Sequence, residues 1–298
     1  MINKVDRAFF ELKHDSETIY QNFQRVIESF NVIVSTYQNS DLVGECTVDP
    51  TEGRVCMGSA LHGWGFTLYT FAKMYAAKFK VKVPNMLQRL WGDNFYNAKT
   101  GKYSTDADEN LPRAFCVFAL DPIIKLASSV HDGKKEEWMG MAEKLGVKLS
   151  SDDLNLEGKK IVRKVMQSWI NAAEALIEMI VLHLPSPRVA QKYRTLYLYE
   201  GDLEDDCAKA MKACDPNGPL MMFISKMIPT SDGGRFYAFG RVFSGKAECS
   251  QKVKIMGPNY KLGKQDDVFE KNIKRVVLMI GRRAEDVVDV PCGNTCAL

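Results

Sequence analysis

The most chemically specific residues of this sequence form its opening motif, Asn3-Lys4-Val5-Asp6. Guanine presents two neighbouring N–H donors, at N1 and at the exocyclic amine, and a single carboxylate can accept both in a bidentate contact. We expect Asp6 to be that carboxylate. Adenine lacks this donor pair and would leave Asp6 unpaired in a desolvated pocket, which disfavours the wrong base. Asn3 is then expected to bond the opposite edge and the neighbouring loops, and the Lys4 stem to cover the ring.

A second candidate loop is the segment Gly58-Ser59-Ala60-Leu61. We expect the backbone N–H groups of Ala60 and Leu61 to donate to the purine O6, and the Ser59 hydroxyl to brace Asp6. Both loops are expected to follow strands, and open α/β sheets bind ligands beyond their strand ends. The alternative interpretation of the opening motif is a strand-end turn before a charged helix. The predicted guanine contacts are Asn3, Lys4, Asp6, Ser59, Ala60 and Leu61.

Several other motifs are interpreted as structural. The segment Gly240–Ala247 matches the phosphate-loop spacing GxxxxGK, but Ala247 stands where a Ser or Thr hydroxyl must hold magnesium. Matches to DxxG at Asp41 and Asp215 are expected to be turns. The four histidines are isolated in the sequence, and His62 is expected to serve packing. No residue is therefore predicted to be catalytic or to bind a metal.

Size and charge limit the class of protein. A chain of 298 residues is long enough for two or three compact units. With 40 basic and 37 acidic side chains, the net charge of +3 lacks the strongly basic balance that announces nucleic-acid binding. The longest apolar runs are too short to cross a bilayer, and no secretory signal is apparent, so we expect a cytoplasmic protein without a membrane partner.

The eight cysteines are scattered without a CxxC pair or a partnering histidine cluster. This pattern favours reduced, mostly buried thiols over a structural zinc site. Cys292 and Cys296 are the only close pair, and both are expected to pack in the core of a strand-like segment.

The first part of the chain predicts a mixture of helices and short strands. An apolar period of three and four predicts a helix over 16–37, with Ser16 as its N-cap. A turn is expected at Asp49–Gly53, followed by a strand through Val55 and Met57 that ends at the second loop. A helix over 66–79 follows.

The next segment, from about 80 to 166, is less regular and is interpreted as an inserted α+β unit. It predicts a hairpin around Thr100 and Gly101, a strand over 113–120 and a helix over 134–147. A mostly apolar helix over 170–184 then ends before two prolines, and its circumference requires a covering partner such as a sheet face. This helix is expected to close the unit that begins at Met1.

After Pro187 the pattern changes to short strands separated by turns. Their regular spacing predicts a closed barrel. The expected turns are DPNG from 215, SDGG from 231 and GPNY from 257. The expected strands cover 193–199, 219–228, 235–245, 252–258, 273–281 and 292–298.

Longer strings of the sequence resemble a known family. They are MINKVDRAFFEL, GSALHGWGFTL, RLWGDNF, LHLPSPRVAQKYR, CDPNGPLMMFISKMIPTSDGGRFYAFGRVFSG, KIMGPNY and DVPCGNTCAL. Together they are similar to the elongation factor 2 family of ribosomal translocases, which are translational GTPases, and the resemblance runs essentially end to end. The NKxD motif is the guanine-recognition element of GTPases.

The resemblance implies a multidomain α/β plus β fold. Residues 1–65 and 169–187 would belong to the C-terminal part of a P-loop GTPase α/β domain, 66–168 to an inserted α+β subdomain, and 188–298 to a translation-factor-type β-barrel. It implies GTP-dependent ribosomal translocation in the cytoplasm, with GTP or GDP as ligand and ribosomal RNA and proteins as partners. We expect an internal fragment that lacks the phosphate loop, the switch regions and the Mg²⁺ ligands, and is inactive alone.

The sequence departs from the family pattern at two positions. Ala60 stands where the family usually has glycine, which should not disturb a backbone contact, and Ser250 replaces a hairpin glycine. Two other functions stay open. One is a docking module that binds ribosomal RNA or protein without nucleotide recognition, and the other is a paralogous GTPase of the spliceosome or of ribosome maturation.

Overall fold

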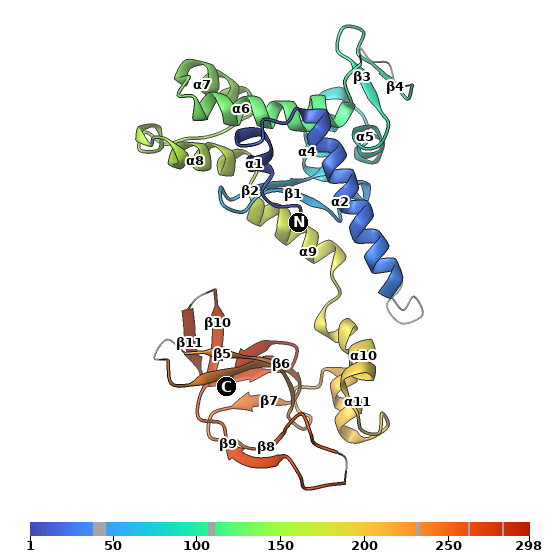
Figure 1. The fold of residues 1–298 in the computed structure, drawn as a ribbon, viewed down its shortest axis with the longest axis vertical. Helices are drawn as coiled ribbons and strands as arrows, with labels where there is room; N and C mark the ends of the chain where they lie inside the picture. Colours follow the sequence, from blue (N-terminus) through green and yellow to red (C-terminus); the bar gives the residue numbers. More distant parts are fainter. Residues whose placement is uncertain (38–45, 107–110, 231–232, 262, 282) are drawn as a thin grey trace. The chain divides into compact units, whose positions relative to one another are not determined.

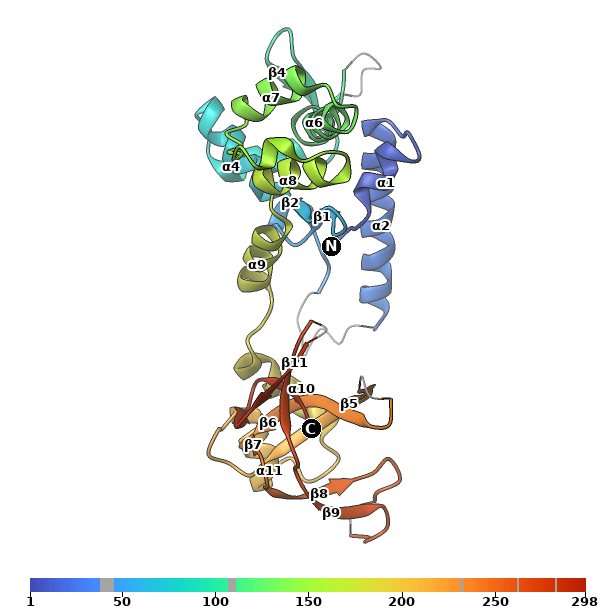
Figure 2. The ribbon, with the colours of Figure 1, turned by 90° about the vertical axis from the view of Figure 1, so that its left-hand side faces the viewer.

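The computed structural model describes residues 1–37, 46–106, 111–230, 233–261, 263–281 and 283–298 (Figures 1 and 2). The chain forms two compact units, Met1–Leu184 and Pro185–Leu298. The first is mainly helical with small sheets, and the second contains a five-stranded antiparallel sheet. Within the described ranges, no helix combines the length and apolar character that a membrane span requires.

The first unit contains helices of very different length around two short hairpins. Its strands are β1 (Cys56–Ser59), β2 (Trp64–Thr67), β3 (Phe95–Asn97) and β4 (Lys102–Ser104). Its helices are α1 (Val5–Phe10), α2 (Ser16–Tyr37), α4 (Leu68–Phe79), α5 (Val83–Leu90), α6 (Asp121–His131), α7 (Lys135–Lys144), α8 (Lys159–Trp169) and α9 (Ala172–His183). Shorter helical turns are η1 (Pro50–Glu52), the π-helical η2 (Cys116–Leu120) and η3 (Asp153–Asn155).

The β1–β2 hairpin is extended on both edges by single residues of other segments. Ile2 pairs in parallel with Met57: its N–H donates to the Cys56 carbonyl at 2.7 Å and its carbonyl accepts from Gly58 at 3.0 Å. On the other edge, Asn171 pairs with Trp64. In both views α9 lies on one side of this hairpin and α6 and α8 on the other (Figures 1 and 2). The chain thus enters α1 from a strand end beside β1.

Close approach of the two hairpin strands explains one glycine of the second loop. A Cβ on Gly58 would lie 2.3 Å from the Trp64 carbonyl oxygen, so no larger residue fits without moving the backbone. Gly63 closes the loop with a φ of 68°, a left-handed conformation that glycine adopts without strain.

The predicted helices over 16–37, 134–147 and 170–184 are confirmed by α2, α7 and α9, and the hairpin around Thr100 by β3 and β4. The predicted turn after Asp49 is the 3-10 turn η1, with Asp49 as its N-cap. The cap of α2 was predicted at the wrong residue. Ser16 is already helical, and the Asp15 carboxylate accepts from the backbone N–H of Thr18 at 2.8 Å.

One further prediction for this unit is wrong. The segment 113–120 is helical rather than a strand: η2 lies within it and continues into α6. Its apolar side chains are buried around the helix, and a fully buried run has no period that separates helix from strand. The helix predicted over 66–79 is confirmed as α4, which begins at Leu68 because Phe66 and Thr67 complete β2.

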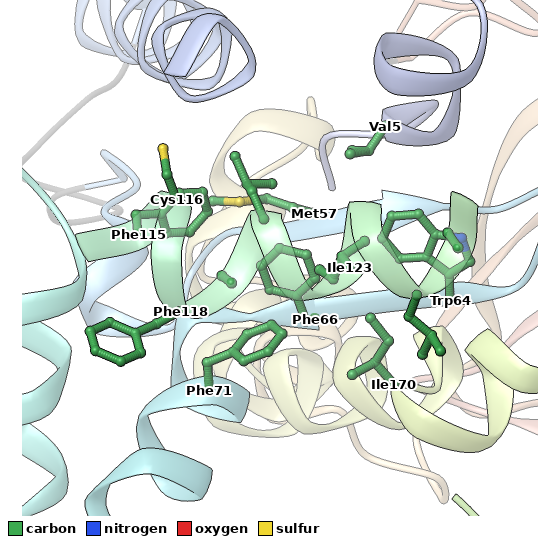
Figure 3. Packing of buried hydrophobic residues seen from close by; sticks show 14 of the residues in the cluster. Val5, Met57, Trp64, Phe66, Phe71, Phe115, Cys116, Phe118, Ile123 and Ile170 are labelled. Carbon is green, nitrogen blue, oxygen red and sulfur yellow. The ribbon is translucent and has the colours of Figure 1, made fainter. Parts of the chain in front are cut away.

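One hydrophobic core fills the first unit (Figure 3). It includes Val5 of α1, Met57 of β1, Phe71 of α4 and Phe115 before η2. The Phe66 and Phe71 rings meet edge to face at 5.0 Å. The predicted segments 1–65 and 66–168 therefore contribute side chains to the same core.

The second unit begins with a pair of helices, α10 (Pro187–Leu198) and α11 (Asp206–Ala213). Its main sheet has the antiparallel order β11-β10-β13-β6-β5, and the pairs β7–β12 and β8–β9 form separate ribbons. The strands are β5 (Met221–Pro229), β6 (Phe236–Ser244), β7 (Lys246–Glu248), β8 (Lys252–Met256), β9 (Val268–Asn272), β10 (Val276–Ile280), β11 (Arg283–Val287), β12 (Asp289–Pro291) and β13 (Thr295–Ala297).

The closed barrel predicted for 188–298 is not found among the described residues. The main sheet ends at β5 and β11, and each ribbon pairs only within itself, so the ladder of strands is open. The predicted strand over 193–199 is also wrong, since it lies in α10. Pro187 starts that helix, and Gln191 and Thr195, one turn apart, face its buried side.

The remaining strand predictions match β5, β6, β8, β10 and β13 in position. Gly240–Ala247 spans β6, a turn and β7, which confirms strand-turn-strand rather than a phosphate loop. Asp215 begins a turn after α11. Ser250, at the former glycine position, has a φ of 66°. The DxxG match at Asp41 and the first half of SDGG lie outside the described residues.

Candidate guanine-recognition site

Asn3 connects the two loops that the sequence singled out. Its Oδ1 atom accepts a hydrogen bond from the backbone N–H of Lys4 at 2.8 Å and another from the backbone N–H of Ala60 at 2.9 Å. The parallel pairing of Ile2 with Met57 places both loops at the same edge of the sheet. The predicted convergence of the opening motif and the second loop is therefore confirmed.

Lys4 holds an unfavourable backbone conformation at the start of α1. Its φ of 66° and ψ of 29° lie in the left-handed region, which costs a residue with a Cβ about 1–2 kcal/mol. The Lys4 carbonyl accepts from the N–H of Arg7 at 3.1 Å and so begins the helix. Such strain persists where the surrounding structure imposes it, and it is concentrated at functional sites.

Asp6 lies in the first turn of α1 and is buried, with 7% of its surface exposed. Among the described residues, none forms a hydrogen bond or ion pair with the Asp6 carboxylate. Its oxygens have no protein partner in these ranges and still reach solvent, so a ligand that donates two hydrogen bonds to them would exchange water for charge-assisted contacts. The side chain is thus free for the bidentate contact that the sequence predicted.

Ser59 does not play its predicted part. It is fully buried, and its hydroxyl oxygen accepts a hydrogen bond from the backbone N–H of His62 at 3.2 Å instead of bracing Asp6. A serine side chain commonly bonds a backbone group a few residues further along its own turn, and here this bond closes the β1–β2 loop. Ser59 shapes the loop from inside.

The predicted pair of backbone donors is reduced to one. The N–H of Ala60 is already engaged by Asn3, because the strand register brings the Asn3 side chain within reach. The N–H of Leu61 has no partner among the described residues, and its side chain is 71% exposed at the tip of the loop. Leu61 is therefore the donor that remains for an acceptor such as O6.

His62 was expected to serve packing, and its ring is buried, with 8% exposed. The ring lies 6.4 Å from that of Phe10, which itself lies 4.9 Å from the ring of His131. Phe10 belongs to α1, so this contact holds the second loop against the helix that carries Asp6. Phe10 is not among the predicted site residues, because no residue near it in the sequence indicates that its ring packs against the second loop.

The chain was also compared with known protein families. No family model matches it. In the parts of the chain that the structure describes, no group of three His, Cys, Asp or Glu side chains is placed to hold a metal ion.

Proposed function

We propose that the chain recognises the guanine base of GTP or GDP as part of a translational GTPase of the elongation factor 2 family. The observation that carries the proposal is the hydrogen bond from Ala60 N–H to Asn3 Oδ1 at 2.9 Å, which joins the two loops beside the unpaired Asp6 carboxylate. In the family, this activity would be GTP-dependent translocation on the ribosome during protein synthesis, in the cytoplasm.

Each group has one role in the proposed contact. Asp6 accepts from N1–H and from the exocyclic amine, and the Leu61 N–H donates to O6. The Lys4 methylene stem covers one face of the ring while its ammonium stays in water. Asn3 positions the second loop, and Ser59 and Ala60 give that loop its shape.

The proposed contacts involve the base alone, so the affinity they supply is small. Charge-assisted hydrogen bonds contribute about 1.5–3 kcal/mol each, while association costs about 4 kcal/mol or more. A dissociation constant of roughly millimolar follows. Mg²⁺ and the phosphates would need residues other than those named here, and we propose no hydrolysis by this chain alone.

The proposal includes the finer domain assignment. Residues 1–65 and 169–187 would belong to a GTPase α/β domain with 66–168 inserted, and 188–298 to a translation-factor domain whose sheet is open among the described residues. Ribosomal RNA and ribosomal proteins would be its partners. A paralogous GTPase of the spliceosome or of ribosome maturation would use the same base contacts.

The test is an exchange of base preference. Amide chemical shifts of the ¹⁵N-labelled chain are followed during titration with GDP, ADP and xanthosine diphosphate at up to about 10 mM, which exceeds the roughly millimolar affinity expected. GDP should move the amides of Lys4 and Leu61, and ADP should not. In Asp6→Asn the response should transfer from GDP to the xanthosine nucleotide, because an amide can donate to the carbonyl at C2 of xanthine.

The matched control is Asp266→Asn, which removes an exposed carboxylate in the second unit and should behave as the unaltered chain. An equal response of the unaltered chain to GDP and ADP would refute base recognition. Absence of any response would favour the docking module instead. Retained guanine preference in Asp6→Asn would remove Asp6 from the site.

A further inference from the structure

Two cysteines that are far apart in the sequence meet in the second unit. Cys214 caps the C-terminal end of α11, and Cys292 follows β12. The Cys292 sulfur lies 3.1 Å from the Cys214 backbone carbonyl oxygen. A Cβ built on Gly293 would lie 3.3 Å from the Cys214 sulfur, so this thiol lies beside the segment that carries Cys292.

The backbone holds the two segments on either side of a single residue, Gly245. The carbonyl of Asp215 accepts from the Gly245 N–H at 2.8 Å, and the carbonyl of Gly245 accepts from the Cys292 N–H at 3.0 Å. Gly245 has a φ of 66°, and a Cβ there would lie 2.8 Å from the Gly218 carbonyl oxygen. The main-chain hydrogen bonds therefore hold the segments that carry Cys214 and Cys292 next to each other.

The pair differs from the one suggested by sequence spacing. Cys296 lies in β13, is fully buried in the core of the sheet and pairs across the ladder with Gly240. Cys292, by contrast, is only partly buried, and Cys214 is 7% exposed. Of these two thiols, Cys292 is thus the one that a small oxidant in solution reaches first.

We propose that Cys214 and Cys292 form a reversible disulfide when the protein meets a peroxide. The Cys292 thiolate attacks one peroxide oxygen, which breaks the O–O bond, releases hydroxide and leaves a sulfenic acid on Cys292. The Cys214 thiolate then attacks that sulfur, the S–S bond forms and a second hydroxide leaves. Two thiols and one hydrogen peroxide give one disulfide and two waters, so the peroxide is the two-electron oxidant.

The surroundings of the thiols set the character of this reaction. Burial raises the pKa of Cys292 to about 11, and the contact with Cys214 and the charge of Asp215 add to the effect. Little thiolate exists at neutral pH, so oxidation is slow. A stable thiolate would favour the reduced form, and these thiols lack one. The disulfide, once formed, therefore resists reduction by weak thiols.

The disulfide would fasten the helical pair to the sheet. α11 packs beside β6 and α10, so a bond from its last residue to the β12–β13 connection closes a long loop across the second unit. A cross-link that closes a loop of this length restricts the unfolded chain, and we expect the melting temperature of the second unit to rise by about 5–10 °C.

The experiment treats the full, unaltered chain with hydrogen peroxide, alkylates the remaining thiols and maps its peptides by mass spectrometry without reduction. A peptide that joins Cys214 to Cys292, lost after dithiothreitol, is expected. Cys292→Ser should abolish it, whereas Cys249→Ser, which removes an exposed thiol elsewhere, should leave it unchanged. The mapping of the unaltered chain does not depend on the folding of any variant.

Three outcomes would overturn the proposal. One is a disulfide between Cys292 and another cysteine, such as Cys296. Another is full alkylation of Cys214 and Cys292 after exposure to excess peroxide for long enough to allow for the slow reaction of a thiol with a raised pKa. The third is conversion of Cys292 to its sulfinic acid without any linked peptide, because a resolving thiol on the neighbouring segment should intercept the sulfenic acid first.

Discussion

Replacing Lys4 by glycine is expected to stabilise the first unit and at the same time to weaken guanine binding. The left-handed backbone at Lys4, with a φ of 66°, costs about 1–2 kcal/mol in a residue with a Cβ. Glycine removes this cost, but it also raises the conformational entropy of the unfolded chain, which lowers the free energy of unfolding by about 0.5–1 kcal/mol. The net gain is about 0.5–1 kcal/mol, which raises the melting temperature by about 1–4 °C for a unit of this size.

The chain offers a matched control in Lys13, which has the same residue type and a φ of 55° but lies outside the candidate site. Lys13→Gly should stabilise the unit by a similar amount and leave guanine binding unchanged. Lys4→Gly removes the methylene stem that covers the base, so van der Waals contacts with one face of the ring are lost. The affinity for GDP, measured from the shift of the Leu61 amide during titration, should fall about threefold to tenfold.

Thermal unfolding followed by circular dichroism measures the first effect, and the titration with GDP measures the second. The strain argument is refuted if Lys4→Gly lowers the melting temperature while Lys13→Gly raises it. The proposed role of the stem is refuted if Lys4→Gly binds GDP as the unaltered chain does. The two results are independent, so each tests its own step.

Two further predictions concern the cores and their polar contacts. Gln191 donates from Nε2 to the carbonyls of Met211 at 2.6 Å and Phe243 at 2.8 Å. Gln191→Leu should remove this donor from the Phe243 carbonyl, while the Met211 carbonyl still accepts from the Cys214 N–H at 3.2 Å, and should cost about 1–3 kcal/mol in urea unfolding of the second unit. Burial raises the pKa of Glu17, but hydrogen bonds from Arg113 and other groups outweigh it and leave that pKa below its ordinary 4.5. The stability from this carboxylate is present above pH 4.5 and lost as the pH falls below it, so acid unfolding monitored by fluorescence should show a shallower pH dependence in Glu17→Gln.

Part of the candidate site could be predicted from residue types and spacing alone. Asp6 and Asn3 were predicted because Asn3-Lys4-Val5-Asp6 resembles the NKxD motif of GTPases, in which a carboxylate suits the two N–H donors of guanine. That Asn3 would reach the second loop followed from placing both loops at strand ends, and its bond to Ala60 confirms this. The role of Ser59 was wrong, since the nearest backbone donor to its hydroxyl, the N–H of His62, was not considered.

Where a segment shows a clear period or a capping residue, the sequence determined its structure. The long helix α2 and the apolar helix α9 follow from periodicity and flanking prolines, and η1 follows from the cap at Asp49. These features depend on contacts within a few residues, which the order of amino acids specifies directly.

The tertiary structure alone decided features that depend on distant partners. The buried apolar segment 113–120 fits a helix and a strand alike, and only its place in the core shows that it is helical. Among the described residues, the strands after Pro187 form an open sheet with β5 and β11 at its edges. The Ala60 N–H is occupied because Ile2 pairs with Met57. Cys292 meets Cys214 rather than Cys296 for the same reason: hydrogen bonds between segments far apart in the chain determine which side chains become neighbours.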